Sequence, residues 1–171
     1  KDMTYSPKEF VSKKSYRNSD FYHGQISDYE GDDYCRGTFK GTPIKFSEID
    51  VHVGNGKSRT RVFKGLFFVC HTGARFRSKT LIQRDRAEAI FGLLGRASQR
   101  WRAPRGYSLV ELESSSFEKT FKVYSDDQIK SRVVLSPRSM ELLTRLFRKY
   151  KGDISVSIIN SRLYIQLRDE K

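Results

Sequence analysis

The stretch TPIKFSEIDVHVGNGKSRTRVFKGLFFVCH, residues 42–71, contains two strand-like segments separated by a glycine-containing loop. Apolar and polar residues alternate through most of the first segment, which is the period of a half-buried strand. The second segment has a continuous apolar run at its centre, which predicts burial on both faces. Gly54, Asn55 and Gly56 between them are typical turn residues. The stretch therefore predicts an antiparallel hairpin.

The alternation changes phase within the first strand of this hairpin. Ile44 and Phe46 share one face, whereas the apolar residues at 49, 51 and 53 share the other. A bulge near Ser47–Glu48 would bring all five to one face, so we predict a bulge there.

The remaining sequence predicts further strands and two principal helices. Residues 84–100 have apolar spacing typical of a helix. Residues 137–150 follow Ser136 as N-cap, and their apolar stripe is expected to face the core (Met140, Leu143, Leu146, Phe147 and Tyr150). Residues 154–167 predict a hairpin with a turn at Asn160-Ser161, and Ser125 with Gln128 predicts a capping box.

These elements predict an α+β fold in which mainly antiparallel strands form a roll or barrel-like sheet with two principal helices. The polar residues 1–20 are expected to form an N-terminal segment over the surface. Residues 21–171 are expected to form a single α+β domain, which suits a chain of 171 residues.

The positive charge is concentrated in the middle of the chain. The net charge is +13, and residues 57–105 alone hold 13 basic and 2 acidic residues. Such a patch favours polyanions, either a phospholipid surface or nucleic acid. The candidate anion-binding residues are Lys57, Arg59, Arg61, Arg75, Arg77, Lys79, Arg100, Trp101, Arg102 and Arg105.

Two features bear on the nature of the polyanion. Trp101 between two arginines is compatible with a lipid headgroup layer, with stacking on a base, and with capping the core at a helix end.

KGLFFVCH, residues 64–71, agrees with the RNA-recognition signature at positions 64, 65, 68 and 69. It departs at 66, 67 and 71, where stacking needs exposed rings. A buried core strand explains the same residues and is favoured.

An acidic stretch, DYEGDDYCRGTFKG at residues 28–41, is the part of the chain most suggestive of chemistry. A calcium loop would need glycine at its sixth and glutamate at its twelfth position, where Asp33 and Phe39 stand. We therefore predict a surface turn whose carboxylates face basic neighbours, with no metal and no cofactor. An enzymatic site would have to be assembled from distant residues such as Asp33, Glu48 and Asp50.

The cysteine pattern is typical of a protein in a reducing compartment, and the hydropathy pattern predicts no membrane-spanning segment within this sequence. Cys35 and Cys70 are expected to be buried free thiols, which fits a reducing compartment. No run approaches the ~20 apolar residues of a membrane helix, and the polar N-terminus does not resemble a signal peptide. The chain begins at Lys1, so an anchor could precede it.

Four blocks of sequence carry a resemblance to a known family: SDFYHGQISDYEGDDYCRGTFKGTPIKFSEIDV, FKGLFFV, FEKTFKVYSDDQIKSRVVLSPRSMELL and INSRLYI. With these blocks, from about Tyr16 to Ile165, the chain resembles an uncharacterised bacterial family, the domain of unknown function thirty-one thirty-seven. Its members typically carry two hydrophobic segments before this region. The resemblance implies the cytosol-facing or otherwise soluble domain of a membrane-anchored protein, and it implies no activity.

The sequence and the resemblance together favour a non-enzymatic, membrane-associated adaptor, expected to be cytoplasmic. Its basic face would contact anionic lipid or a partner protein. The alternatives are a nucleic-acid-binding domain that uses the same cations, and an enzyme with a site built from distant residues.

Overall fold

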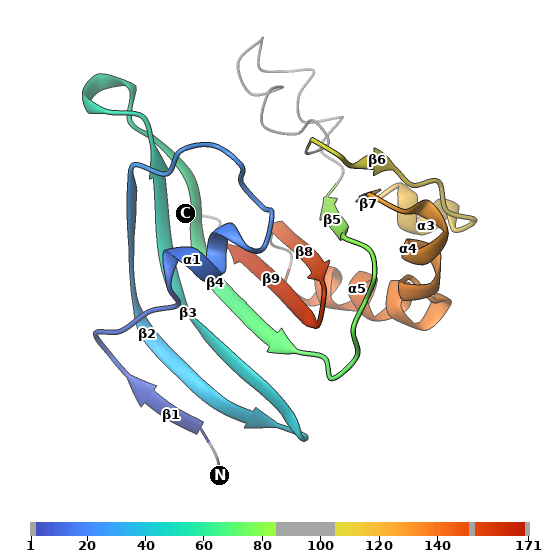
Figure 1. The fold of residues 1–171 in the computed structure, drawn as a ribbon, viewed down its shortest axis with the longest axis horizontal. Coiled ribbons are helices and arrows are strands. Elements are labelled where there is room, and N and C mark those ends of the chain that lie inside the picture. Colours follow the sequence, from blue (N-terminus) through green and yellow to red (C-terminus); the bar gives the residue numbers. More distant parts are fainter. Residues whose placement is uncertain (1–2, 85–104, 151–152, 170–171) are drawn as a thin grey trace.

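The computed structural model describes residues 3–84, 105–150 and 153–169, and the strands in these ranges form a single antiparallel sheet (Figure 1). The nine strands lie in the order β1-β2-β3-β4-β9-β8-β5-β7-β6. Their bounds are β1 Met3–Ser6, β2 Asp28–Phe39, β3 Thr42–Val53, β4 Thr60–His71, β5 Thr80–Arg84, β6 Ser108–Leu109, β7 Phe121–Ser125, β8 Asp153–Ile159 and β9 Arg162–Arg168. The described helices are α1 Lys13–Arg17, α3 Ser115–Glu118, α4 Gln128–Val134 and α5 Pro137–Tyr150, with a 3-10 turn η1 at Gly56–Ser58.

The hairpin predicted from residues 42–71 is confirmed as β3 and β4, which pair along most of their length. The predicted bulge near Ser47–Glu48 is wrong. β3 continues without a break there, and the extra residue lies in β2, between Asp32 and Cys35. Ser47 is fully buried, and its Oγ accepts a hydrogen bond of 2.9 Å from the backbone N–H of Val11, which offsets the cost of burying the hydroxyl. A polar residue therefore occupies a core position, and the two apolar sets of β3 face opposite sides.

The acidic stretch is also a strand rather than the predicted turn, since β2 spans Asp28–Phe39. The turn that follows it is at Lys40 and Gly41, and both have positive φ. Two successive positive φ values are typical of the two-residue hairpin loop that matches strand twist.

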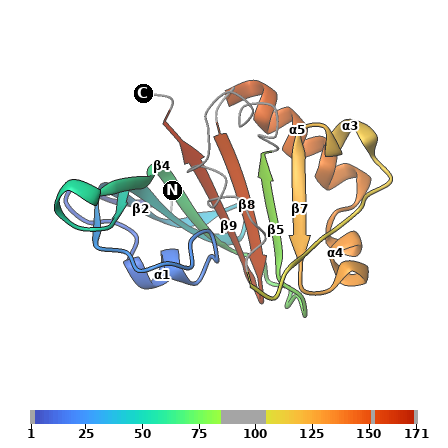
Figure 2. The ribbon, with the colours of Figure 1, turned by 90° about the horizontal axis from the view of Figure 1, so that it is seen from above.

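The sheet is open, because β1 and β6 lie at its two ends and do not pair with each other. The prediction of an α+β fold with mainly antiparallel strands is confirmed, but the sheet does not close into a roll or barrel. The long strands β2, β3 and β4 run in a different direction from β8, β5 and β7 (Figure 2). This change of direction accumulates from the twist between neighbouring strands.

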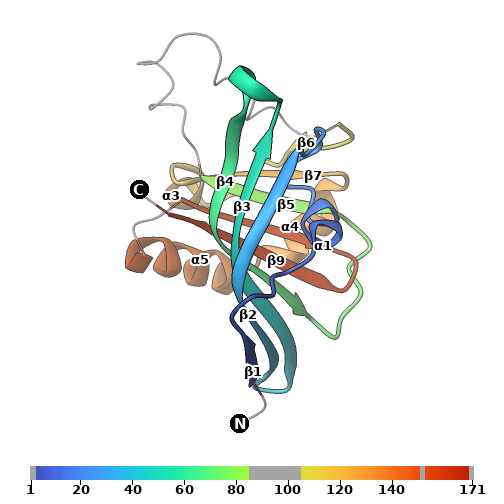
Figure 3. The same cartoon turned by 90° about the vertical axis from the view of Figure 1, so that its left-hand side faces the viewer.

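The helices cover opposite faces of the sheet, with α1 on one side and α5 on the other (Figure 3). The α1 face carries Ile49, Val51 and Phe67, all buried in one core cluster with Tyr16 of α1. The α5 face carries a second cluster that includes Val156, and Met140, Leu143, Leu146 and Phe147 of α5 pack against it. The two cores therefore lie on opposite faces.

Helix α5 and the hairpin of β8 and β9 confirm two sequence predictions, including the turn at residues 160 and 161. The stripe of α5 is half-buried rather than fully buried, and Tyr150 is 53% exposed. The helix predicted over residues 84–100 lies, from residue 85 onwards, outside the described residues.

The N-terminal residues contribute to the fold instead of lying over its surface. β1 pairs with β2 at the edge of the sheet, and Val11 and Tyr16 are buried in the core. Cys35 and Cys70 are free thiols as predicted, but both are half-buried. Burial raises the pKa of Cys70 above its ordinary value.

Candidate functional site

The predicted anion-binding residues do not form one cluster, because β4 separates them. Lys57, Arg59 and Arg61 lie at or before the beginning of β4, whereas Arg75 and Arg77 follow its end. A strand of 12 residues spans roughly 35 to 40 Å at ~3.3 Å per residue. Arg100, Trp101 and Arg102 lie outside the described residues, and Arg105 is exposed immediately after them.

At the β3–β4 end, carboxylates hold two of the three cations. The guanidinium of Arg59 lies 2.6 Å from Asp28, and that of Arg61 lies 3.0 Å from Asp50. The expectation that carboxylates of the acidic stretch face basic neighbours is thus confirmed for Asp28. This end has little net charge left to attract a polyanion.

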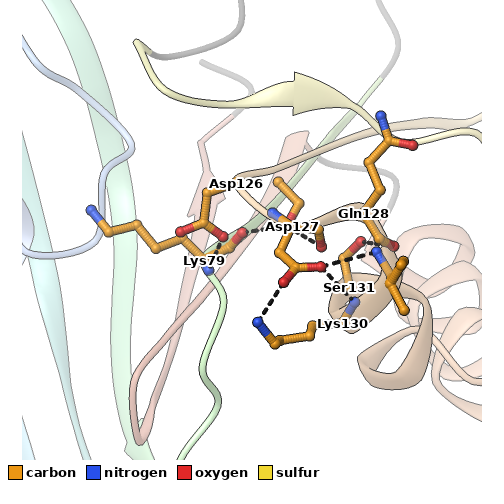
Figure 4. Close-up of polar contacts among 8 residues, drawn as sticks. Lys79, Asp126, Asp127, Gln128, Lys130 and Ser131 are labelled. Atoms are coloured by element: carbon orange, nitrogen blue, oxygen red, sulfur yellow. Dashed lines mark hydrogen bonds and ion pairs between the residues drawn. The ribbon is translucent and has the colours of Figure 1, made fainter.

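Of the cations that follow β4, Lys79 lies beside the start of α4 (Figure 4). The backbone N–H of Lys79 donates to Asp126 at 2.7 Å, and the carbonyl of Lys79 accepts from Ser125 Oγ at 2.7 Å. Lys79 also places its ammonium 3.1 Å from Asp20, whose carboxylate accepts from Tyr107 as well. Lys79 therefore joins the β4–β5 loop to α4, and its charge is paired.

Helix α4 begins differently from the sequence prediction. Asp127 is its N-cap, and its carboxylate accepts from the N–H groups of Ile129 and Lys130. Ser125 instead bonds to the carbonyls of Lys79 and Asp127. The predicted capping box of Ser125 with Gln128 is therefore wrong, because Asp127 is the N-cap and the Ser125 hydroxyl is bonded to Lys79 of the β4–β5 loop.

The exposed face of α4 is apolar. Ile129 is 78% exposed and Val133 is 79% exposed, although both are large hydrophobic residues. They are four residues apart and so adjoin on one face of the helix. Lys130 and Arg132 are also exposed and, at 100° per residue, flank this face on its two sides. The buried side of α4 carries Ser131 and is followed by the buried Leu135.

We call the following residues the α4 end: Ile129, Lys130, Arg132 and Val133 of α4, together with Arg77 of the β4–β5 loop and Arg105. Arg77 is two residues from Lys79, which is bonded to the residue before the α4 cap. Arg105 is two residues from Tyr107, which shares Asp20 with Lys79. Sequence analysis identified Arg77 and Arg105 but not the apolar pair, because an i, i+4 apolar pair ordinarily predicts a buried stripe.

The contacts within the structure give less support to an RNA-recognition motif, an enzymatic site or a metal site. In the RNA-like segment Phe67 is fully buried, and Phe68 stacks on Phe46 with centroids 4.9 Å apart. Of the proposed enzymatic residues, Asp33 accepts from Tyr5 and Asp50 pairs with Arg61. Glu48 lies opposite Asp32. Across the described ranges, no group of histidine, cysteine and acidic residues is arranged to hold a metal ion.

None of the helices in the described part of the chain combines the length and apolar character that crossing a membrane requires.

Comparison with known proteins supports the fold and the family. The crystal structure of the mycobacterial trehalose monomycolate transport factor A, TtfA, is similar with a TM-score of 0.52. The match has 7% sequence identity and covers 98% of this chain and 76% of that chain, so it shows a likeness of fold alone. No curated protein matches the chain. A family described as protein of unknown function (DUF3137) matches residues 61–171, more than half of the chain, and the chain therefore belongs to this family.

Proposed function

We propose that this domain is a non-enzymatic, membrane-associated module that binds anionic lipid surfaces through the α4 end. The observation that carries the proposal is the exposure of Ile129 and Val133 between Lys130 and Arg132. Apolar residues flanked by cations are the pattern of helices that lie in the interfacial layer of a membrane. The apolar side chains would enter the headgroup layer while the cations meet anionic lipid.

The expected affinity is modest and depends on salt. Each cation near an anionic surface contributes about 1 kcal/mol. Arg77, Arg105 and Arg132 make no ion pair with a described residue, so they would contribute roughly 3 kcal/mol, or about a hundredfold in binding. Lys130 contributes less, because Asp127 pairs with it. Burial of the Ile129 and Val133 side chains in the membrane would add a binding free energy of similar size, once the cations have brought α4 to the membrane surface.

A weak peripheral contact of this kind would suit a domain whose chain is already anchored nearby. The family resemblance, with its two hydrophobic segments before this region, implies such an anchor. An anchored domain needs no high affinity, since tethering raises its effective concentration at the surface. We therefore propose that the α4 end orients the domain against the membrane rather than recruiting it.

Vesicle co-sedimentation tests the proposal. The wild-type domain should bind vesicles that contain phosphatidylglycerol and not vesicles of phosphatidylcholine alone, and physiological salt should weaken the binding. The double variant Ile129→Ser/Val133→Ser should lose most binding without losing its fold, because both side chains are exposed. Arg77→Ser/Arg132→Ser should weaken binding about tenfold or more.

The matched controls change similar side chains elsewhere. Leu142→Ser replaces an apolar residue that is 50% exposed on α5, and Lys40→Ser/Lys57→Ser removes two exposed charges at the tips of the hairpins. Both controls should bind like the wild type. Equal losses in controls and test variants would contradict a specific α4 end. Displacement of the vesicles by short RNA would favour nucleic-acid binding instead.

A further inference from the structure

Two open hollows lie side by side where the N-terminal segment meets β2 and β3. Their volumes are about 450 Å³ and 420 Å³. They share a wall made of Tyr34, Arg36 and Lys45. No sequence pattern marks this place, because the wall combines residues from two strands.

The two cations of the shared wall are cross-strand partners. Arg36 of β2 lies directly opposite Lys45 of β3. Side chains in this relation are about 5 Å apart at Cβ, and like charges there destabilise a sheet. Neither cation makes an ion pair with a described residue; the ammonium of Lys45 donates only to Ser15 Oγ, at 3.3 Å. The pair therefore lacks a counter-charge.

Neighbouring groups add to the positive potential. Burial lowers the pKa of Lys45, and the guanidinium of Arg162 lowers it further. Lys8 lines one hollow and His71 lines the other. Glu9 is the acidic side chain among the described residues that line these hollows, and it makes no ion pair with the described cations. Burial and Arg162 thus disfavour the charged form of Lys45, and an anion bound at the wall would offset both effects.

We propose that Arg36, Lys45 and Tyr34 form a binding site for the phosphate group of a small anion. The Arg36 guanidinium offers a planar pair of donors that matches two phosphate oxygens. Lys45 supplies a compact charge from the opposite strand, and the Tyr34 hydroxyl can donate a hydrogen bond to a third oxygen. The hollows have the size of sites for small ligands, which leaves room for the group that carries the phosphate.

Isothermal titration calorimetry with inorganic phosphate, and separately with glycerol 3-phosphate, tests this site. Chloride at equal ionic strength is the control anion. Binding should be saturable. Lys45→Met and Arg36→Met should each weaken it about tenfold or more, since each loses a charge-assisted hydrogen bond. Lys45→Arg should retain most of it. The control is Lys64→Met, which removes an exposed lysine from β4 on the α5 face.

The outcomes separate clearly. Tighter binding of glycerol 3-phosphate would identify a lipid-headgroup-like ligand, and equal binding would identify free phosphate. Absence of saturable binding with both probes, or an equal loss in Lys64→Met, would overturn the site. Circular dichroism checks folding, and the exposed Arg36 provides a variant that should fold if Lys45→Met does not. Ile129→Ser/Val133→Ser should still bind phosphate, so this site and the α4 end can fail independently.

Discussion

At the scale of single residues, Gly65 shows how closely β4 and β9 approach each other. Its φ is +141°, a conformation that side chains rarely adopt. A Cβ built at this position would lie 2.1 Å from the carbonyl oxygen of Leu167. The glycine that gives KGLFFVCH its likeness to an RNA-binding signature is thus required by the neighbouring strand.

We expect Gly65→Ala to destabilise the domain by about 3 kcal/mol or more, because a strained conformation and a backbone clash act together. The control is Gly56→Ala, where φ is +54° and no atom lies within 4 Å of the added Cβ. That control should cost about 1 kcal/mol. Urea unfolding measures the free energy of unfolding of both variants. Similar losses of stability would contradict the close contact between Gly65 and Leu167 of β9.

The Asp127 carboxylate makes the stability of the start of α4 sensitive to acid. Hydrogen bonds from the Lys130 side chain and from the backbone N–H of Lys130 hold the pKa of Asp127 below its ordinary value of 3.8. The folded-state pKa is the lower one, so this stabilisation is present above pH 3.8 and is lost as the pH falls through the lowered pKa.

NMR titration of the Ile129 and Lys130 amide protons checks this. Both signals should move with a midpoint below pH 3.8. Asp127→Asn, which can still cap the helix, should abolish that titration. A midpoint at or above 3.8 would mean that the carboxylate is not bonded as described.

At the scale of helices and strands, the sequence predicted an element correctly where its residue pattern is compatible with only one structure. The N-cap, Pro137 and the apolar spacing identified α5, and alternation with Asn160-Ser161 identified the β8–β9 hairpin. The prediction failed in β3 because the phase change of its apolar residues has two explanations. A bulge and a strand buried on both faces give the same pattern, and they are distinguished by the unbroken register of β3 with β4 at Ser47–Glu48 and by the hydrogen bond from Val11 to Ser47.

The candidate site was predictable only in part for a similar reason. Sequence analysis found the excess of cations, and Arg77 and Arg105 remain in the α4 end. It could not find that Asp28 neutralises Arg59, because the two residues meet only through the pairing of β2, β3 and β4. Nor could it distinguish the exposed pair on α4 from a core stripe, since that depends on how Ser131 and Leu135 pack.

At the scale of the whole molecule, the open sheet separates surfaces of different character. The β3–β4 end carries paired charges, whereas the α4 end carries exposed apolar side chains and three arginines that make no ion pair with a described residue. The proposed phosphate site lies on the α1 face near β1, where Arg36 and Lys45 have no counter-charge among the described residues. If the α4 end contacts a membrane, the paired charges of the β3–β4 end would therefore not take part in that contact.

If the α4 end binds membranes as we propose, Ile129 enters the headgroup layer of an anionic membrane. The most direct measurement places a tryptophan there, as Ile129→Trp in a Trp101→Phe background, since Trp101 is the only tryptophan of the chain. Leu142→Trp in the same background is the control. We predict that phosphatidylglycerol vesicles shift the emission of the residue-129 variant to shorter wavelength and that brominated lipid quenches this emission. The emission of the control should change little. Unchanged emission at residue 129, or equal quenching at both positions, would contradict the proposal.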